Sequence, residues 1–121
     1  MSSLPETSAE FTWLPQPDLA TLDVGVLLHA LADPTRLQIV RLLMEKGEGS
    51  CGSLELPVNR STVSHHLRIL RDSGVVSTRL QGTSRLSRLR WDEIEERFPG
   101  LFPAIIDAAP PADRTSGGRS H

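Results

Sequence analysis

The residues of this 121-residue chain best suited to chemistry gather in one segment, residues 61–73, whose pattern predicts a helix. At 100° per residue, its apolar side chains fall on one side and its hydroxyl, imidazole and guanidinium groups fall on the other. Short hydrogen-bonding groups of this kind suit the base edges of a DNA major groove, and hydroxyls near a helix start suit phosphates. The alternative is an ordinary solvated helix face. The residues expected to contact DNA from this helix are Ser61, Thr62, Ser64, His65 and Arg68.

Positive charge extends beyond this helix. Residues 59–90 contain seven arginines and one acid, which gives this third of the chain a charge of +6. The whole chain has a net charge of −2, so the other residues together carry −8. A basic third between acidic flanks favours an anionic partner such as nucleic acid over a merely soluble surface. The further residues expected to contact DNA are Arg60, Arg79, Thr83, Arg85 and Arg88.

Metal and redox chemistry have little support. Cys51 is the one cysteine, which excludes an internal disulfide and a zinc site built from several thiolates of one chain. It is either a redox switch or an inert small hydrophobe, and we favour the inert interpretation. His65 and His66 diverge by 100° on a helix and are poorly placed to chelate one ion. We therefore expect no metal site and no cofactor, although a site between subunits using His29 or His121 stays open.

Other classes of function are disfavoured by what the chain lacks. It has no P-loop, glycine-rich dinucleotide motif or paired-carboxylate context, so we do not expect an enzyme. No stretch approaches the roughly 18 apolar residues that a membrane span needs. We expect a cytoplasmic protein with no membrane partner.

The elements that must position the basic third follow from the apolar pattern. We expect one domain over residues 18–108, between a flexible arm at 1–17 and a disordered tail at 109–121. The predicted helices span residues 18–32, 34–46, 48–56 and 61–73, and a last helical segment from Asp92 is divided near Pro99–Gly100 and Pro103. Strands at 75–80 and 84–90 flank a Gln81-Gly82-Thr83 turn. This predicts a mainly α fold with a small β-hairpin (α+β), a winged helix-turn-helix in which the hairpin is the wing.

Three segments match a known family in order and spacing. Residues 31–37 (LADPTRL), 61–71 (STVSHHLRILR) and 74–76 (GVV) strongly resemble the ArsR/SmtB family of bacterial winged-helix repressors, and the resemblance covers roughly residues 20–107. It implies a homodimer in which each recognition helix enters one half of an inverted-repeat operator. Thiolate sensors use a cysteine pair, of which Cys51 supplies one sulfur and Ser53 stands where a second would be, and the last helix has none of the histidines of zinc-type members. The chain therefore resembles a subgroup without these metal sites.

In this family the first and last helices pack across the two-fold axis. The residues expected at this dimer interface are Leu22, Val26, Leu27, Phe98, Leu101, Phe102, Ile105 and Ile106. The small folded part also favours a dimer, because a short chain buries too little apolar surface to be very stable alone.

The sequence thus predicts a sequence-specific transcriptional regulator, a repressor that binds double-stranded operator DNA as a homodimer. An unidentified effector or sensor protein is a further possible partner. Two alternatives stay open: a winged helix used for protein–protein contact, and a metal- or redox-responsive repressor with a non-standard sensing site.

Overall fold

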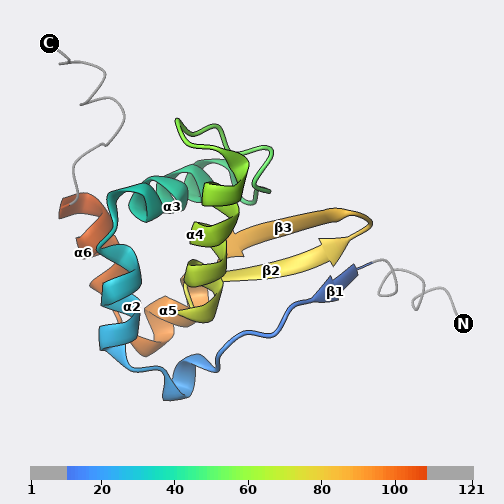
Figure 1. Cartoon of the computed structure of the whole chain (residues 1–121). Coiled ribbons are helices and arrows are strands. Elements are labelled where there is room, and N and C mark those ends of the chain that lie inside the picture. The colour runs from blue at the N-terminus through green and yellow to red at the C-terminus, as the bar shows by residue number, and fades with distance from the viewer. Residues whose placement is uncertain (1–10, 109–121) are drawn as a thin grey trace, which may run out of the picture.

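A computed structural model describes residues 11–108 of the chain as a group of helices with a small antiparallel sheet at one side (Figure 1). The expectations for residues 1–10 and for the tail at 109–121 lie outside the described residues. The helical elements are η1 (Leu19–Thr21), α2 (Val24–Leu31), α3 (Pro34–Lys46), α4 (Arg60–Asp72), α5 (Trp91–Arg97) and α6 (Leu101–Ala108). The strands are β1 (Phe11–Trp13), β2 (Val76–Gln81) and β3 (Ser84–Leu89). The predicted α+β winged-helix fold is confirmed.

Local capping chemistry sets the helix boundaries. Asp33 caps α3 by accepting a 3.0 Å hydrogen bond from the Arg36 amide, with Pro34 at the first helical position. Gly47 ends α3 with φ +89°, a conformation that favours glycine. The single helix predicted at 18–32 is wrong, because Asp18 and Asp23 each cap a separate element and the backbone between η1 and α2 is extended at Leu22 and Asp23.

The short helix predicted at 48–56 is also wrong. Residues 50–54 form a single turn, in which the Leu54 amide donates to the Ser50 carbonyl. The Ser50 and Ser53 hydroxyls each accept a hydrogen bond from the other residue's amide, at 3.2 and 2.9 Å. Such side-chain bonds compete with helical hydrogen bonding. Just before this turn, Gly49 pairs with Ser87 of β3, which draws the chain toward the sheet.

The sheet contains a strand that the sequence did not predict. Its order is β1-β2-β3, and Phe11 lies opposite Gln81 while Trp13 lies opposite Arg79. Residues 11–13 of the expected flexible arm therefore belong to the folded domain. The pairing continues one residue further, because the Leu14 amide donates to the Thr78 carbonyl at 2.8 Å.

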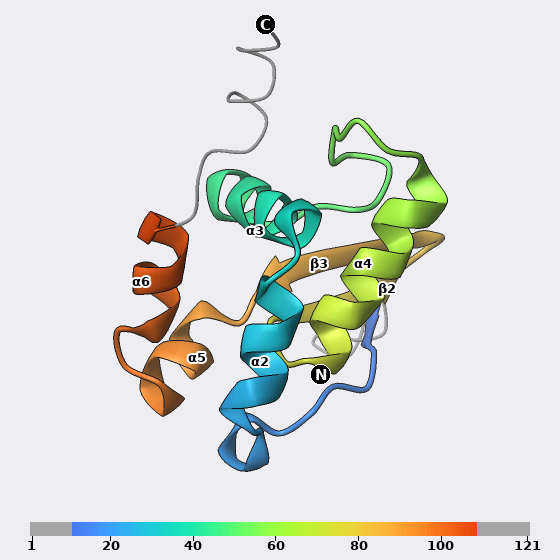
Figure 2. The ribbon, with the colours of Figure 1, turned by 60° about the vertical axis from the view of Figure 1, so that its left-hand side comes forward.

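One hydrophobic core joins the helices to the base of the sheet. Its fully buried side chains include Leu27, Ile39, Leu70, Val76 and Phe102. In both ribbon views α6 lies at the end of the molecule away from the tip of the β2–β3 hairpin, and α2 lies between α6 and α4 (Figures 1 and 2). No helix of the described residues is long and apolar enough to span a membrane.

Burial corrects part of the expected dimer interface. Leu27 and Phe102 have no exposed surface, and Leu22 and Ile106 are also buried within the single chain. These four side chains fill the chain's own core, so they are not available to a second subunit. Of the other expected interface residues, Val26 is exposed, whereas Phe98, Leu101 and Ile105 are partly buried.

Candidate nucleic-acid interface

A side-chain cap stabilises the first turn of helix α4, and buried side chains hold the helix to the core. The Asn59 side-chain oxygen accepts hydrogen bonds from the Thr62 amide at 2.9 Å and from the Ser61 hydroxyl at 2.8 Å. This satisfies one of the amides that a helix start leaves unpaired. Buried Val63, Leu67 and Leu70 then anchor the inner side of the helix.

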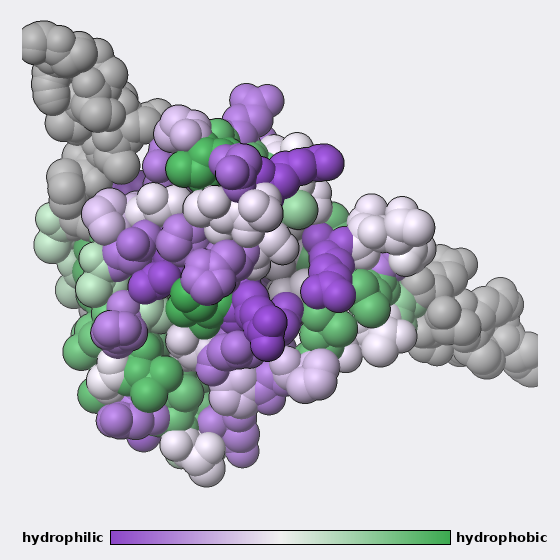
Figure 3. All heavy atoms as spheres, in the orientation of Figure 1, coloured by the Kyte–Doolittle hydropathy of each residue, from purple (hydrophilic) through white to green (hydrophobic). Residues whose placement is uncertain are grey.

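The outer side of α4 carries the polar residues that the sequence placed there. Ser61, Ser64, His65 and Arg68 are exposed, and Thr62 is half-buried. Figure 3 shows hydrophilic residues gathered over the middle of this face, where α4 lies. The Arg68–Asp72 ion pair is long, at 3.9 Å, and both side chains are largely exposed. A pair of this kind holds its arginine weakly, so Arg68 is available to an outside partner.

A hollow of about 420 Å³ lies between α4 and the wing, the β2–β3 hairpin. Its lining comes from both elements: Ser61, Ser64, His65, Leu67, Arg68 and Arg71 of α4, and Thr78, Arg85 and Ser87 of the wing, together with Cys51. At the base of the wing the Thr78 and Ser87 hydroxyls form a buried 2.8 Å hydrogen bond across the strands. The polar side of α4 and one side of the wing therefore form a single concave surface with three arginines.

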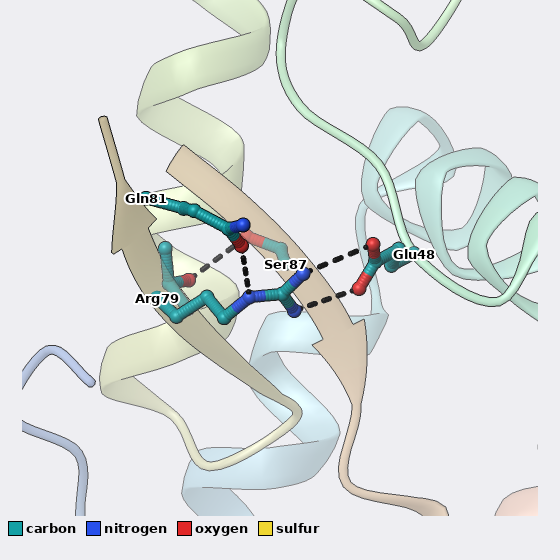
Figure 4. Close-up of polar contacts among 5 residues, drawn as sticks. Glu48, Arg79, Gln81 and Ser87 are labelled. Carbon is teal, nitrogen blue, oxygen red and sulfur yellow. Dashed lines mark hydrogen bonds and ion pairs between the residues drawn. The ribbon is translucent and has the colours of Figure 1, made fainter. Parts of the chain in front are cut away.

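The wing arginines divide between its two faces. Side chains alternate along a strand, and Arg85 shares the face of Ser87 toward α4. Arg79 and Arg88 belong to the opposite face. The Arg79 guanidinium forms a two-pronged ion pair with Glu48 at 2.7 and 3.2 Å, and Figure 4 shows it extending from β2 past β3. The structure thus does not bring Arg79 and Arg88 to the surface that contains Arg85.

Two other expected contacts, Thr83 and Arg60, do not line this hollow. Thr83 is exposed in the turn of the wing, next to Gly82 with φ +64°. Arg60, the first residue of α4, is exposed, and its guanidinium lies so close to Gly52 that a Cβ there would clash with it. Arg60 therefore lies at the turn that precedes α4.

His66 is a structural residue on the inner edge of α4. Its Nδ1 atom lies 3.3 Å from the Arg36 guanidinium, which also donates a 2.7 Å hydrogen bond to the Ala30 carbonyl. Because a guanidinium can only donate, Nδ1 accepts, and the imidazole is neutral. Burial lowers the pKa of His66 and outweighs Asp33, which raises it, while Arg36 and His65 lower it further. His66 thus joins α2, α3 and α4 through Arg36.

Glu48 and Arg79 each stabilise the charged form of the other. The hydrogen bond from Arg79 is the largest influence on the Glu48 carboxyl and lowers its pKa, and the charges of Arg79 and Arg88 act in the same direction. The pair links the segment after α3 to the wing.

The described residues offer no assembled metal site. Within residues 11–108, no group of three or more His, Cys, Asp or Glu side chains is placed to hold an ion. Cys51 is half-buried at the hollow, and His29 is exposed on α2. His121 lies outside the described residues.

Sequence reasoning missed several residues of this region. Arg71 lines the hollow, and its position seven residues after Ser64 was a usable signal, because residues seven apart share a helix face. Phe11 and Trp13 support the outer side of the wing, where the Arg79 and Arg88 guanidinium carbons lie 5.7 and 4.9 Å from their ring centres. Their alternation around Thr12 was a weak strand signal.

Comparisons with known proteins identify the family of this chain. Residues 33–78 match the family described as bacterial regulatory protein, arsR family. The biofilm growth-associated repressor of Agrobacterium fabrum is 34% identical over 91 residues, which cover 74% of this chain and 77% of that protein. The arsenical resistance operon repressor of Escherichia coli is 39% identical over 85 residues, covering 69% of this chain and 68% of that one.

A solved structure shows the same fold. The crystal structure of Rv0081 from Mycobacterium tuberculosis aligns over 100% of both chains with a TM-score of 0.54 and 22% sequence identity. The sequence matches and the shared architecture lead to one assignment: this chain is a member of the arsR family of bacterial regulatory proteins, with a winged helix-turn-helix fold.

Proposed function

We propose that this protein is a DNA-binding transcriptional repressor that binds an inverted-repeat operator as a homodimer. The observation that carries the proposal is the concave surface shared by α4 and the wing, where Arg68, Arg71 and Arg85 line one hollow. Clustered guanidinium groups favour a polyanion, and an exposed polar helix suits a major groove. The names of its relatives as repressors support the same role.

The residues of this surface divide between two tasks. Ser64, His65 and Arg68 lie on the exposed middle of α4, where they would contact base edges. The polar residues near the start of α4 and the inner side and tip of the wing would contact the phosphate backbone. The proposed backbone contacts are Arg60, Ser61, Thr62, Arg71, Thr83 and Arg85. Arg79 and Arg88, which the sequence placed among the DNA contacts, are assigned instead to the support of the wing.

The opposite end of the molecule supplies a surface for the second subunit. Val24 and Leu28 lie four residues apart on α2 and are 36% and 42% exposed. Leu101 and Ile105 have the same spacing on α6 and are partly exposed. Figure 3 shows hydrophobic residues along the edge of the molecule formed by α2 and α6. Pairing of this edge about a two-fold axis would leave both recognition helices free for two half-sites.

The proposal includes no enzymatic activity and places the protein with its DNA target in the cytoplasm.

A selection experiment tests the proposal. The purified full chain is used to enrich binders from a random duplex library, and fluorescence anisotropy then measures affinity at several salt concentrations. We expect an inverted repeat whose half-site centres are about 34–36 Å apart, or a multiple of this, with affinity that falls steeply as salt rises. If no sequence is enriched over random duplex, sequence-specific repression is wrong and the protein-interaction alternative is favoured.

A further inference from the structure

The face of the wing away from α4 carries an ordered array that DNA contact does not explain. The Arg79 guanidinium carbon lies 5.7 Å from the Phe11 ring centre, and the Arg88 carbon lies 4.9 Å from the Trp13 ring centre. The two rings meet edge to face, with centres 5.8 Å apart. We call these four residues the outer cluster. It joins all three strands, because its members come from β1, β2 and β3.

The wing is held at both edges. On one edge, β1 pairs with the half of β2 nearest the turn, where Trp13 lies opposite Arg79 and Phe11 lies opposite Gln81. On the other edge, Gly49 and Ser87 exchange backbone hydrogen bonds of 2.9 and 2.8 Å. The Arg79–Glu48 ion pair crosses β3 to the same segment (Figure 4). A two-stranded hairpin is marginally stable alone in water, whereas a third strand and side-chain packing stabilise it.

The chain that follows β1 is anchored to the helical body. The Arg90 side chain is only 4% exposed, and its guanidinium donates a 2.8 Å hydrogen bond to the Pro17 carbonyl. Arg97 of α5 donates a 3.1 Å hydrogen bond to the Leu19 carbonyl, and Leu19 itself is buried. The segment after β1 is therefore fixed in place, so β1 can hold the wing against the body.

We propose that β1 is a positioning strand, in which Phe11 and Trp13 hold Arg79 and Arg88 on the outer face and so present Arg85 on the face toward α4. Arg79 and Arg88 act on DNA affinity through the outer cluster without contacting DNA. The inference rests on the proposed DNA-binding function and adds to it a set of residues that determine the geometry of the wing.

The first test is made without DNA. Amide hydrogen exchange across β2 and β3 is compared in the wild type, Trp13→Leu and Trp13→Phe. Trp13 is 42% exposed, so neither change opens the core. We expect faster exchange at residues 79–86 in Trp13→Leu, which keeps an apolar side chain but has no aromatic face, and near-normal exchange in Trp13→Phe. Exchange in α3 should not change in either variant. Unchanged exchange of the wing in Trp13→Leu would overturn the proposal.

The second test is a double-mutant cycle on duplex affinity. We expect Trp13→Leu to weaken binding by about two- to five-fold and Trp13→Phe to restore most of the loss. In an Arg85→Ala background the effect of Trp13→Leu should disappear, whereas in an Arg68→Ala background it should persist. An equal effect in both backgrounds would show that Trp13 does not act through Arg85 and would overturn the proposal.

The two tests also separate this inference from the function on which it rests. Failure of the wild type to bind any duplex would contradict the repressor, and the exchange experiment would still decide whether β1 orders the wing.

Discussion

At the scale of single residues, the arginines of the basic third perform two different tasks. Arg68 and Arg85 line the hollow between α4 and the wing, and the ion pair of Arg68 with Asp72 is long and exposed. Arg79 has close partners within the chain, with its side chain only 16% exposed. Residue type alone does not separate these tasks, because the difference comes from the face of the strand or helix on which each arginine lies.

Arg68 is predicted to discriminate between bases. Arg68→Ala should cost about 1–3 kcal/mol of binding free energy on the selected operator and less on a scrambled duplex, because a guanidinium can bond two acceptors of guanine. Anisotropy titrations on both duplexes measure the difference. Arg68→Lys is the matched control, since it keeps the charge and loses the planar fork. Equal losses on both duplexes would show that Arg68 only contacts phosphates.

His66 is predicted to make folding stability depend on pH. Its pKa is lowered from 6.5 in the folded chain, chiefly by burial, so the unfolded chain binds the proton more readily. The contribution of His66 to the free energy of unfolding should therefore be complete above about pH 6.5. Below that value the free energy of unfolding should fall as the pH decreases. Urea unfolding between about pH 5 and 8 measures this. His66→Gln should show a weaker decline, and an identical decline would rule out His66 as the cause.

At the scale of elements, local signals predicted α3 and α4 but did not separate η1 from α2, although Asp18 and Asp23 cap these two elements. The predicted bounds of 34–46 agree with α3, and those of 61–73 lie within one residue of α4, because capping by Asp33 and Asn59 and the positive φ of Gly47 and Gly74 depend on near neighbours. β1 was missed because a three-residue strand has almost no periodicity of its own. Its order comes from pairing with residues 79–81, about seventy positions away, and from two arginines on other strands.

The Asn59 cap gives a prediction about α4 as an element. Asn59→Ala should lower the free energy of unfolding by about 1 kcal/mol, because the Thr62 amide and the Ser61 hydroxyl lose the side-chain oxygen of Asn59 as an acceptor. Asn59→Ser should retain most of the stability, since serine also caps helices well. Urea denaturation of the three proteins makes the comparison. A serine variant as unstable as the alanine variant would contradict the capping role.

At the scale of the whole molecule, the proposed DNA surface and the exposed apolar edge lie on different sides of the folded protein. The sequence could show that the first and last helices are apolar, but it could not decide which apolar residues fill the chain's own core. The structure makes that division: Leu27 and Phe102 have no exposed surface, whereas Leu28 is 42% exposed. Sequence reasoning placed these buried residues at the dimer interface, because a short helix has apolar residues on more than one side and the sequence does not show which side faces the core.

The proposed dimer can be tested at neighbouring positions of α2. Leu28→Asp should give a folded monomer, because it places a charge in the proposed interface and leaves the core intact. Leu27→Asp should instead unfold the chain, because it buries a charge in the core. Sedimentation velocity and circular dichroism distinguish the two outcomes. A Leu28→Asp protein that sediments as an unperturbed dimer would place the interface elsewhere.

The most direct test of the central claim, that α4 and the inner face of the wing bind one duplex together, is the salt dependence of operator affinity. The slope of log affinity against log salt concentration is measured for the wild type, Arg85→Ala and Lys46→Ala. Lys46 is the charge-matched control, because it is exposed on the last turn of α3 and belongs neither to the lining of the hollow nor to the outer cluster. The account predicts a slope shallower by about 1 in Arg85→Ala and unchanged in Lys46→Ala. The same slope in all three proteins would contradict it.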